Sequence, residues 1–216
     1  MDASVAVSSD REIVQLGRPS HAASCFVLQD KSCTENDATA PFYDPKFGLY
    51  HYFFAVHPGN RKVKRHVVSR NLAHWAYLPI PFWDGPEPFD EEAVFTGSTT
   101  VVDRTPRFVY PGLCDRKSKR WPSCDTGTNL CIAVPANASD PFYVNWTKAG
   151  VIMNNTQRDP STAWQDPATG EWRLTTFGPA VYGSMDFKTW YGARLDAVRG
   201  KERGGRGPGR SDEPAL

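Results

Sequence analysis

The sequence predicts an all-β protein, built as a propeller or a sandwich. Three observations lead to this fold class. The chain of 216 residues has a heavy aromatic load, with 7 Trp, 8 Tyr and 12 Phe. Short strand-like runs recur along it, and turn formers, drawn largely from 17 Gly and 18 Pro, separate nearly all of them. No segment sustains the 3.6-residue apolar period of an amphipathic helix, so helix should be minor. Many short strands joined by turns are typical of propellers and sandwiches.

The expected strands follow from runs of apolar and β-branched residues. In order they are ASCFVLQ (23–29), GLYHYFFAV (48–56), KRHVVSR (64–70), AVFTGSTTVVD (93–103), RFVYPG (107–112), TNLCIAVPA (128–136), STAWQDPATGEWRLTTFG (161–178) and AVYGSMDFKTWYGARL (180–195). The run LYHYFF at 49–54 predicts a buried strand, because nearly every side chain in it is aromatic or apolar. The segment 166–170, Asp-Pro-Ala-Thr-Gly between two aromatic strands, predicts a hairpin.

Composition divides the chain into three parts and excludes several partners. Residues 1–17 are expected to be a poorly ordered leader, and residues 18–198 the folded domain. Residues 199–216 contain five Gly, many charges and no aromatic residue, so they predict a disordered tail. Either a natural linker or a misread intron or frameshift would produce this abrupt change. The net charge of +1 argues against nucleic acid or an anionic membrane as partner, and no run is long enough to span a bilayer.

Cysteine and asparagine patterns suggest the compartment. The five Cys residues (25, 33, 114, 124 and 131) form no metal-ligand spacing, so no metal is expected. Three of them, Cys114, Cys124 and Cys131, share one loop-rich region and could supply a disulfide there. Three N-glycosylation patterns lie close together, at Asn137-Ala138-Ser139, Asn145-Trp146-Thr147 and Asn154-Asn155-Thr156. Together these patterns favour a secreted or vacuolar protein, although no signal peptide is visible in this chain.

Two carboxylates occupy positions that suit either a turn or a site. Asp37 follows Asn36 in a short acidic segment ahead of the aromatic strand, and Asp159 stands between Arg158 and Pro160. Asn, Asp and Pro make turns readily, and a lone Arg-Asp-Pro is more often a turn with a surface ion pair. The functional alternative is a carboxylate kept ionised by a neighbouring cation. Two such carboxylates converging on one pocket are what a glycosidase requires.

The order of several segments resembles the N-terminal part of glycoside hydrolase family 32. The matching segments are RPSH (18–21), END (35–37), LYHYFF (49–54), HVVSRNLAHWAYLPI (66–80), VFTGSTTV (94–101) and QRDPSTAWQDPATGEWRLTTFG (157–178). This family contains invertases, fructan hydrolases and fructosyltransferases. The resemblance implies a five-bladed β-propeller, of which this chain would form about three blades. It also implies hydrolysis of β-fructofuranosides such as sucrose or fructans, with a small sugar as the substrate and no cofactor.

The resemblance also implies roles for individual residues. Asp37 matches the family's nucleophile, which attacks the anomeric carbon of a fructosyl unit. Asp159 matches the aspartate that stabilises the transition state by binding fructose hydroxyls, with Arg158 beside it. Substrate-binding positions are implied for Asn36, Arg158, Phe95 and Thr96. Small residues after the nucleophile, Ala38, Thr39 and Ala40, are expected to keep the approach to Asp37 clear.

Several departures from the family pattern qualify this assignment. The turn behind the nucleophile is Asp37-Ala38-Thr39-Ala40 and lacks the family's Pro and Gly, and Ala55 stands where the family usually has Gln. The segment 55–65 lacks the family's Trp-Gly. No Glu-Cys pair occurs anywhere in the chain, so the acid/base Glu is absent and residues 1–216 alone are expected to be inactive. These departures leave open an alternative, a noncatalytic fructoside-binding pseudoenzyme on the same scaffold.

The remaining polar residues have ordinary structural interpretations. His51 and His66 lie in predicted strands and are expected to be core histidines. The basic residues 61, 62, 64 and 65 are expected to form a solvated hairpin tip, at a place where they would rim the pocket.

Overall fold

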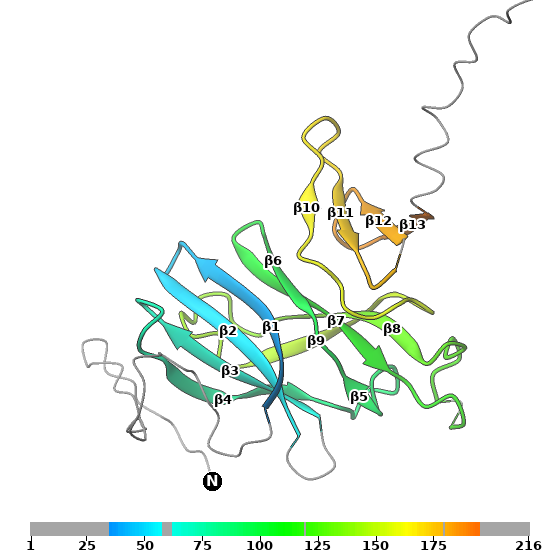
Figure 1. Ribbon diagram of the computed structural model, residues 1–216, viewed down its shortest axis with the longest axis horizontal. Helices are drawn as coiled ribbons and strands as arrows, with labels where there is room; N and C mark the ends of the chain where they lie inside the picture. Colours follow the sequence, from blue (N-terminus) through cyan, green and yellow to red (C-terminus); the bar gives the residue numbers. More distant parts are fainter. Residues whose placement is uncertain (1–34, 58–61, 119, 179, 195–216) are drawn as a thin grey trace, which may run out of the picture.

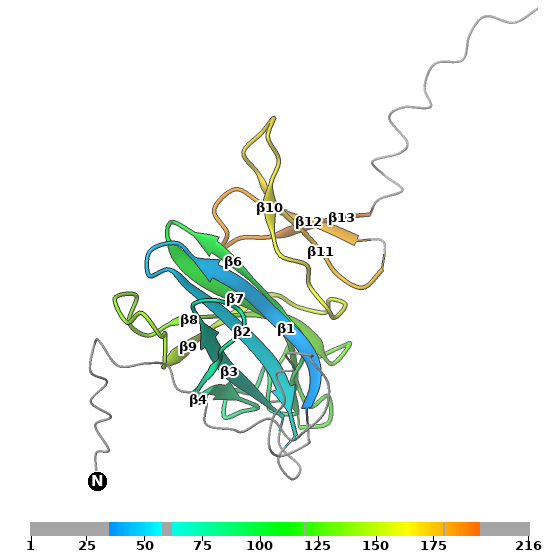
Figure 2. The same cartoon turned by 60° about the vertical axis from the view of Figure 1, so that its left-hand side comes forward.

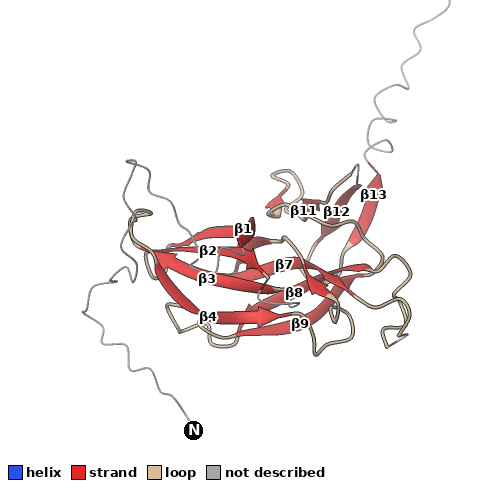
Figure 3. Ribbon diagram, turned by 60° about the horizontal axis from the view of Figure 1, so that its bottom comes forward, coloured by secondary structure: helices blue, strands red, loops and turns tan. Residues whose placement is uncertain are grey.

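The computed structural model describes residues 35–57, 62–118, 120–178 and 180–194. Within these ranges every regular element is a β-strand, as Figure 3 shows, so the all-β prediction is confirmed. This part of the chain therefore contains no helix that is long and apolar enough to cross a membrane. The predicted strand at 23–29, the leader at 1–17 and the tail at 199–216 lie outside the described residues.

The first sheet is an antiparallel meander in chain order. Its strands are β1 (Glu35–Asp44), β2 (Leu49–Val56), β3 (Val63–Ser69) and β4 (Ala76–Trp83). The strand predicted at 49–54 is β2, and six of its eight residues are buried, with Tyr50 and Tyr52 half-buried. Two bulges interrupt the pairing of β1 with β2, one between Glu35 and Ala38 and one between Thr39 and Phe42.

One edge of the second sheet is interrupted, and we call this its inner edge because it faces the other two sheets. Its strands are β5 (Ala93–Val94), β6 (Ser98–Val102), β7 (Thr105–Leu113), β8 (Thr128–Pro135) and β9 (Trp146–Met153). Both β5 and β6 pair with β7, at its two ends, so residues 93–102 follow one edge of β7 with a break at Phe95–Gly97. The sequence predicts one continuous strand here, and the structure corrects that prediction.

The third sheet is smaller and also runs in chain order. Its strands are β10 (Trp164–Gln165), β11 (Trp172–Thr175), β12 (Ala180–Ser184) and β13 (Tyr191–Arg194). The hairpin predicted at 166–170 is confirmed, because Gln165 pairs with Trp172 across it. Figures 1 and 2 both show this sheet near β6 and far from β4.

Two apolar clusters join the three sheets in series. The first lies between the first and second sheets and has Ala40, Phe53, Phe82, Phe89, Val94, Phe108, Tyr110, Cys131, Ala133, Tyr143 and Trp146 at its centre. The second joins the second and third sheets through Val102, Val109, Leu130, Ile132, Ala163, Leu174, Tyr182, Phe187 and Trp190. Each four- or five-stranded sheet therefore packs face to face on the next, which is the arrangement of successive propeller blades.

The histidines predicted to lie in the core do so. His51 on β2 and His66 on β3 are buried, and Nδ1 of His51 lies 3.0 Å from Nε2 of His66. Aromatic rings cover the pair, with Phe42 stacked on His51 and Phe53 stacked on His66. The two histidines are thus buried polar side chains surrounded by the aromatic rings of the first apolar cluster.

The disulfide prediction is resolved by the structure. Cys114 and Cys124 are bonded and close a loop after β7, while Cys131 on β8 is a buried free thiol. We expect Cys114→Ala/Cys124→Ala to lower the free energy of unfolding by about 2–3 kcal/mol, because the crosslink restricts the unfolded chain. Denaturant unfolding of the oxidised and the variant protein measures this difference. Cys131→Ala is the comparison for loss of a thiol without loss of the crosslink.

Candidate active site

A β-bulge presents Asp37. The ladder between β1 and β2 joins Glu35 to Val56 and Ala38 to Phe54, so Asn36 and Asp37 together face Ala55. A bulge turns the extra side chain out of the regular alternation. Both bulge side chains are exposed. Asp37 therefore lies within a strand rather than in the loop that the sequence suggests.

The break between β5 and β6 lies directly against this bulge. The Thr96 hydroxyl donates a hydrogen bond to Oδ2 of Asp37 over 2.8 Å. Beside it, Thr39 and Gly97 form two hydrogen bonds between the first and second sheets. The Thr39 hydroxyl donates to the Gly97 carbonyl and accepts from the Gly97 amide, each over 2.7 Å. A Cβ on Gly97 would lie 2.2 Å from the Val109 carbonyl oxygen, so only glycine permits this contact.

The hydrogen bonds between Thr39 and Gly97 change the role expected for the small residues after Asp37. Thr39 and Ala40 are buried, and the Ala40 amide also donates to the Gly97 carbonyl. These two residues hold β1 against the second sheet and do not border open space. Of the three small residues, Ala38 alone is exposed and leaves the surface beside Asp37 uncovered.

Asp159 lies in a similar irregular segment of the third sheet. The Phe177 amide donates to the Arg158 carbonyl, and the Ser161 amide donates to the Thr175 carbonyl, so residues 158–161 follow β11 as an inner edge. Between these bonds Asp159 has a φ of 58°, a left-handed conformation that is uncommon outside glycine. Its carboxylate lies 3.4 Å from Nε of Arg158, and both side chains are exposed. An exposed ion pair of this kind contributes about 0–1 kcal/mol, so stability alone does not explain it.

The three irregular segments lie side by side at the inner edges of their sheets. Thr96 joins the second segment to Asp37 in the first. The second and third segments are also joined, because the Ser98 hydroxyl donates to the Ser161 carbonyl. Ser98 is two residues after Thr96, and Ser161 is two residues after Asp159. The predicted site residues therefore come from three neighbouring inner edges and approach one region of the molecule. Among the described residues no hydrogen bond or ion pair joins Asp159 to Asp37, whereas Thr96 bonds Asp37 directly.

Two lysines adjoin this region, and one of them is buried where an exposed residue was predicted. Lys62 lies with its Nζ 4.6 Å from the centre of the ring of Phe95, one of the expected substrate-binding residues. Lys64, expected in a solvated hairpin tip, is fully buried. Burial lowers its pKa to about 8, against the opposing charge of Asp37. The sequence could have predicted this burial. Alternate residues of a strand share one face, so Lys64 lies on the same face as His66 and Val68, which is the inward face of β3.

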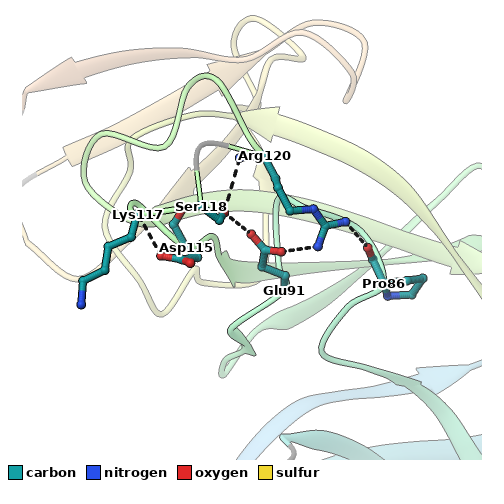
Figure 4. Close-up of polar contacts among 6 residues, drawn as sticks. All are labelled: Pro86, Glu91, Asp115, Lys117, Ser118 and Arg120. Atoms are coloured by element: carbon teal, nitrogen blue, oxygen red, sulfur yellow. Dashed lines mark hydrogen bonds and ion pairs between the residues drawn. The ribbon is translucent and has the colours of Figure 1, made fainter.

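A separate surface groove lies away from these residues. It has a volume of about 510 Å³ and is lined by Asp84, Gly85, Pro86, Glu91, Glu92, Asp115 and Arg120. Figure 4 shows that Arg120 bonds Glu91 and the Pro86 carbonyl, and that Ser118 also bonds Glu91. The acidic lining is thus partly neutralised within the protein. We place the candidate active site at Asp37 and not in this groove, because the groove contains none of the residues of the three inner edges.

The residues that form this site lie in a recognisable domain. A model of the glycosyl hydrolases family 32 N-terminal domain matches residues 29–204. The chain belongs to glycosyl hydrolase family 32. The family resemblance inferred from the sequence motifs is thereby confirmed, and the three packed sheets are part of a family 32 propeller.

Family 32 relatives and solved structures match the same part of the chain. Acid beta-fructofuranosidase 1, vacuolar, of a Rosa hybrid cultivar is 31% identical over 188 residues, which cover 77% of this chain and 30% of the relative. Beta-fructofuranosidase, insoluble isoenzyme 1, of Oryza sativa subsp. indica is 35% identical over 182 residues, covering 74% and 29%. The crystal structure of fructan 1-exohydrolase IIa from Cichorium intybus matches with a TM-score of 0.61 at 28% identity, covering 74% and 31%. The chain therefore spans about 30% of the length of the curated relatives that it matches.

Proposed function

We propose that this family 32 chain carries the nucleophile-bearing part of a retaining β-fructofuranosidase that acts on sucrose or fructans. The observation that carries the proposal is the exposed Asp37 carboxylate on its bulge, bonded by Thr96 and approached by the Arg158–Asp159 segment. The names of the relatives support the same activity, and one solved structure of the chicory exohydrolase holds 1-kestose.

The proposed chemistry follows from the two carboxylates. An Asp37 oxygen forms a bond to the anomeric carbon of the fructosyl unit, while the bond from that carbon to the leaving oxygen breaks and its electron pair stays on that oxygen. Positive charge develops on the sugar ring in between, and the Asp159 carboxylate stabilises it while accepting from sugar hydroxyls. In this proposal Asn36 and Phe95 contact the same fructosyl unit. The leaving oxygen of sucrose also needs a proton, for which these 216 residues hold no Glu-Cys motif.

The proposed compartment is the vacuole or the cell exterior. The rose relative is named as vacuolar. The Cys114–Cys124 disulfide fits an oxidising route of synthesis, since such bonds are rare in cytosolic proteins. The three N-glycosylation patterns are consistent with the same route.

A substrate that needs no proton donor tests the nucleophile directly. The inactivity expected of residues 1–216 follows from the missing proton donor, so it applies to substrates such as sucrose whose leaving oxygen must be protonated. We expect the same chain to release p-nitrophenolate from p-nitrophenyl β-D-fructofuranoside, because that leaving group departs without protonation. Sucrose should be cleaved slower by about 10²–10⁴-fold, the usual contribution of a general acid. Asp37→Asn should lower p-nitrophenolate release by at least about 100-fold, because it removes the attacking carboxylate.

Glu92→Gln is the matched control, since Glu92 lines the separate groove and should not affect release. Release that survives Asp37→Asn would refute the assignment of Asp37. Fructoside binding without any release would instead favour the noncatalytic alternative. The altered residues Ala38 and Ala55 beside Asp37 are the observation that keeps this alternative in view.

A further inference from the structure

Lys64 lies in one row with the proposed nucleophile. Lys64 on β3 pairs with Ala55 on β2 and with Phe82 on β4, and the bulge that contains Asp37 faces Ala55 on the other side. Residues directly opposite in an antiparallel sheet present their side chains on the same face. Phe82 belongs to the apolar cluster between the first and second sheets, so the Lys64 side chain enters that interface, where Thr96 meets Asp37.

The Lys64 ammonium is buried without a hydrogen-bond partner. Its Nζ is shielded from solvent, and none of the described residues accepts a bond from it. A buried ammonium carries three donors, and leaving them unpaired is costly. Buried cations in folded proteins are therefore paired, or they bind a ligand.

The charges around Lys64 single out Asp37. Ala55 and Phe82, its neighbours in the row, are uncharged. Next to it in the chain, Arg65 on β3 and Lys62 just before β3 are cationic, and Asp84 accepts a bond from the Lys62 backbone amide rather than from Lys64. Asp37 is the one anion whose charge acts appreciably on Lys64 within the described part of the chain. Ala55, which pairs with Lys64 and faces the bulge of Asp37, stands between the two groups in this row.

We propose that Lys64 is a substrate-binding residue of this site, whose ammonium donates a hydrogen bond to a hydroxyl oxygen of the fructosyl unit held at Asp37. The proposal rests on the proposed function, because it requires a sugar at Asp37. A lysine has four rotatable side-chain bonds, so a small movement of its outer methylenes brings Nζ to the ligand. The bound sugar then supplies the acceptor that the protein lacks.

The protonation of Lys64 gives the proposal a second signature. Burial lowers the Lys64 pKa to about 8, so the group is cationic at pH 6 and largely neutral at pH 9.5. A sugar oxygen bonds more strongly to the cation than to the neutral amine. Affinity for fructose should therefore fall as pH rises through about 8.

The test is fructose binding to the 216-residue chain, measured by isothermal titration and by the chemical shift of the Lys64 ε-carbon in ¹³C-lysine-labelled protein. We expect fructose to shift the Lys64 resonance. Lys64→Met should weaken binding about 10–100-fold at pH 6, as for loss of a charge-assisted hydrogen bond. The variant should also lose the fall in affinity above pH 8. Lys188→Met, which removes an exposed lysine of the third sheet, is the matched control and should bind as the wild type does.

The outcomes separate this proposal from the proposed function. Fructose binding that Asp37→Asn weakens but Lys64→Met leaves within twofold, with no shift of the Lys64 resonance, would overturn the role of Lys64 and leave the site in place. Absence of fructose binding by the wild-type chain would overturn both. The resonance shift is measured on wild-type protein, so the result does not depend on how well the variant folds.

Discussion

Replacement of Lys148 by methionine is expected to lower the free energy of unfolding by about 3–5 kcal/mol at pH 7, the usual cost of leaving one buried charge unpaired. Lys148 on β9 lies 2.7 Å from Oδ2 of Asp90, which is fully buried, and it also donates to the Gly85 carbonyl. The Tyr110 hydroxyl donates to the same Asp90 oxygen. The variant removes the cation and leaves the carboxylate with Tyr110 alone.

The pH dependence of the variant identifies the cause. Burial already raises the pKa of Asp90, and the bonds from Lys148 and Tyr110 oppose that rise. Without Lys148 the pKa rises further, so Asp90 takes up a proton more readily and the loss of stability should shrink as pH falls. Denaturant unfolding at several pH values measures this trend.

A second substitution distinguishes loss of charge balance from loss of packing. Asp90→Asn/Lys148→Met removes both charges and should be more stable than Lys148→Met alone. Lys46→Met is the surface comparison, because Lys46 is exposed and its ammonium contacts the Ala138 carbonyl and the Phe47 ring rather than a buried carboxylate. If the double variant is no more stable than Lys148→Met, the buried charge is not the cause.

Local sequence features predict the strands well because each strand is decided by its own side chains. The aromatic run at 49–54 and the hairpin around Asp166–Gly170 follow from apolar content and turn chemistry, and both appear as expected. The break at Phe95–Gly97 could not be predicted in this way. It depends on the close approach of Gly97 to β7, which is a contact between strands rather than a property of residues 93–102.

The sequence proposes residues for the candidate site but does not predict their geometry. The motif order selects Asp37, Phe95, Thr96 and Asp159, and the structure places them at adjoining inner edges. The bulge that exposes Asp37 depends on strand register, which distant pairing decides. The burial of Lys64 was not predicted, because its charge favours solvent whereas its place in the alternation of β3 puts it on the same face as His66. A lysine at an inward position is a local conflict, and such conflicts are expected at functional sites.

A second large change in the free energy of unfolding is expected when the pH is lowered. Between pH 7 and pH 4 the His51–His66 pair should lower the free energy of unfolding by about 3 kcal/mol or more. Burial lowers the pKa of His51 to about 4, despite Asp44 and Asp140, and burial together with His51 lowers the pKa of His66 well below its usual value. The unfolded chain binds these protons near pH 6.5, whereas the folded chain does not. The stability is therefore fully present above pH 6.5 and is lost as pH falls towards 4.

Substitution of both rings tests this origin. His51→Phe/His66→Phe keeps aromatic volume between Phe42 and Phe53 and removes both titrating groups, so its stability should vary much less between pH 6.5 and pH 4. His74→Gln is the control, because His74 is exposed in the turn before β4 and should leave the pH profile unchanged. An acid-sensitive profile that persists in the double variant would assign the loss to carboxylates instead. If the free energy of unfolding of the double variant no longer varies with pH, then His51 and His66 limit the acid stability of the sheet that carries Asp37. These two residues would then set the lowest pH at which the proposed site stays folded.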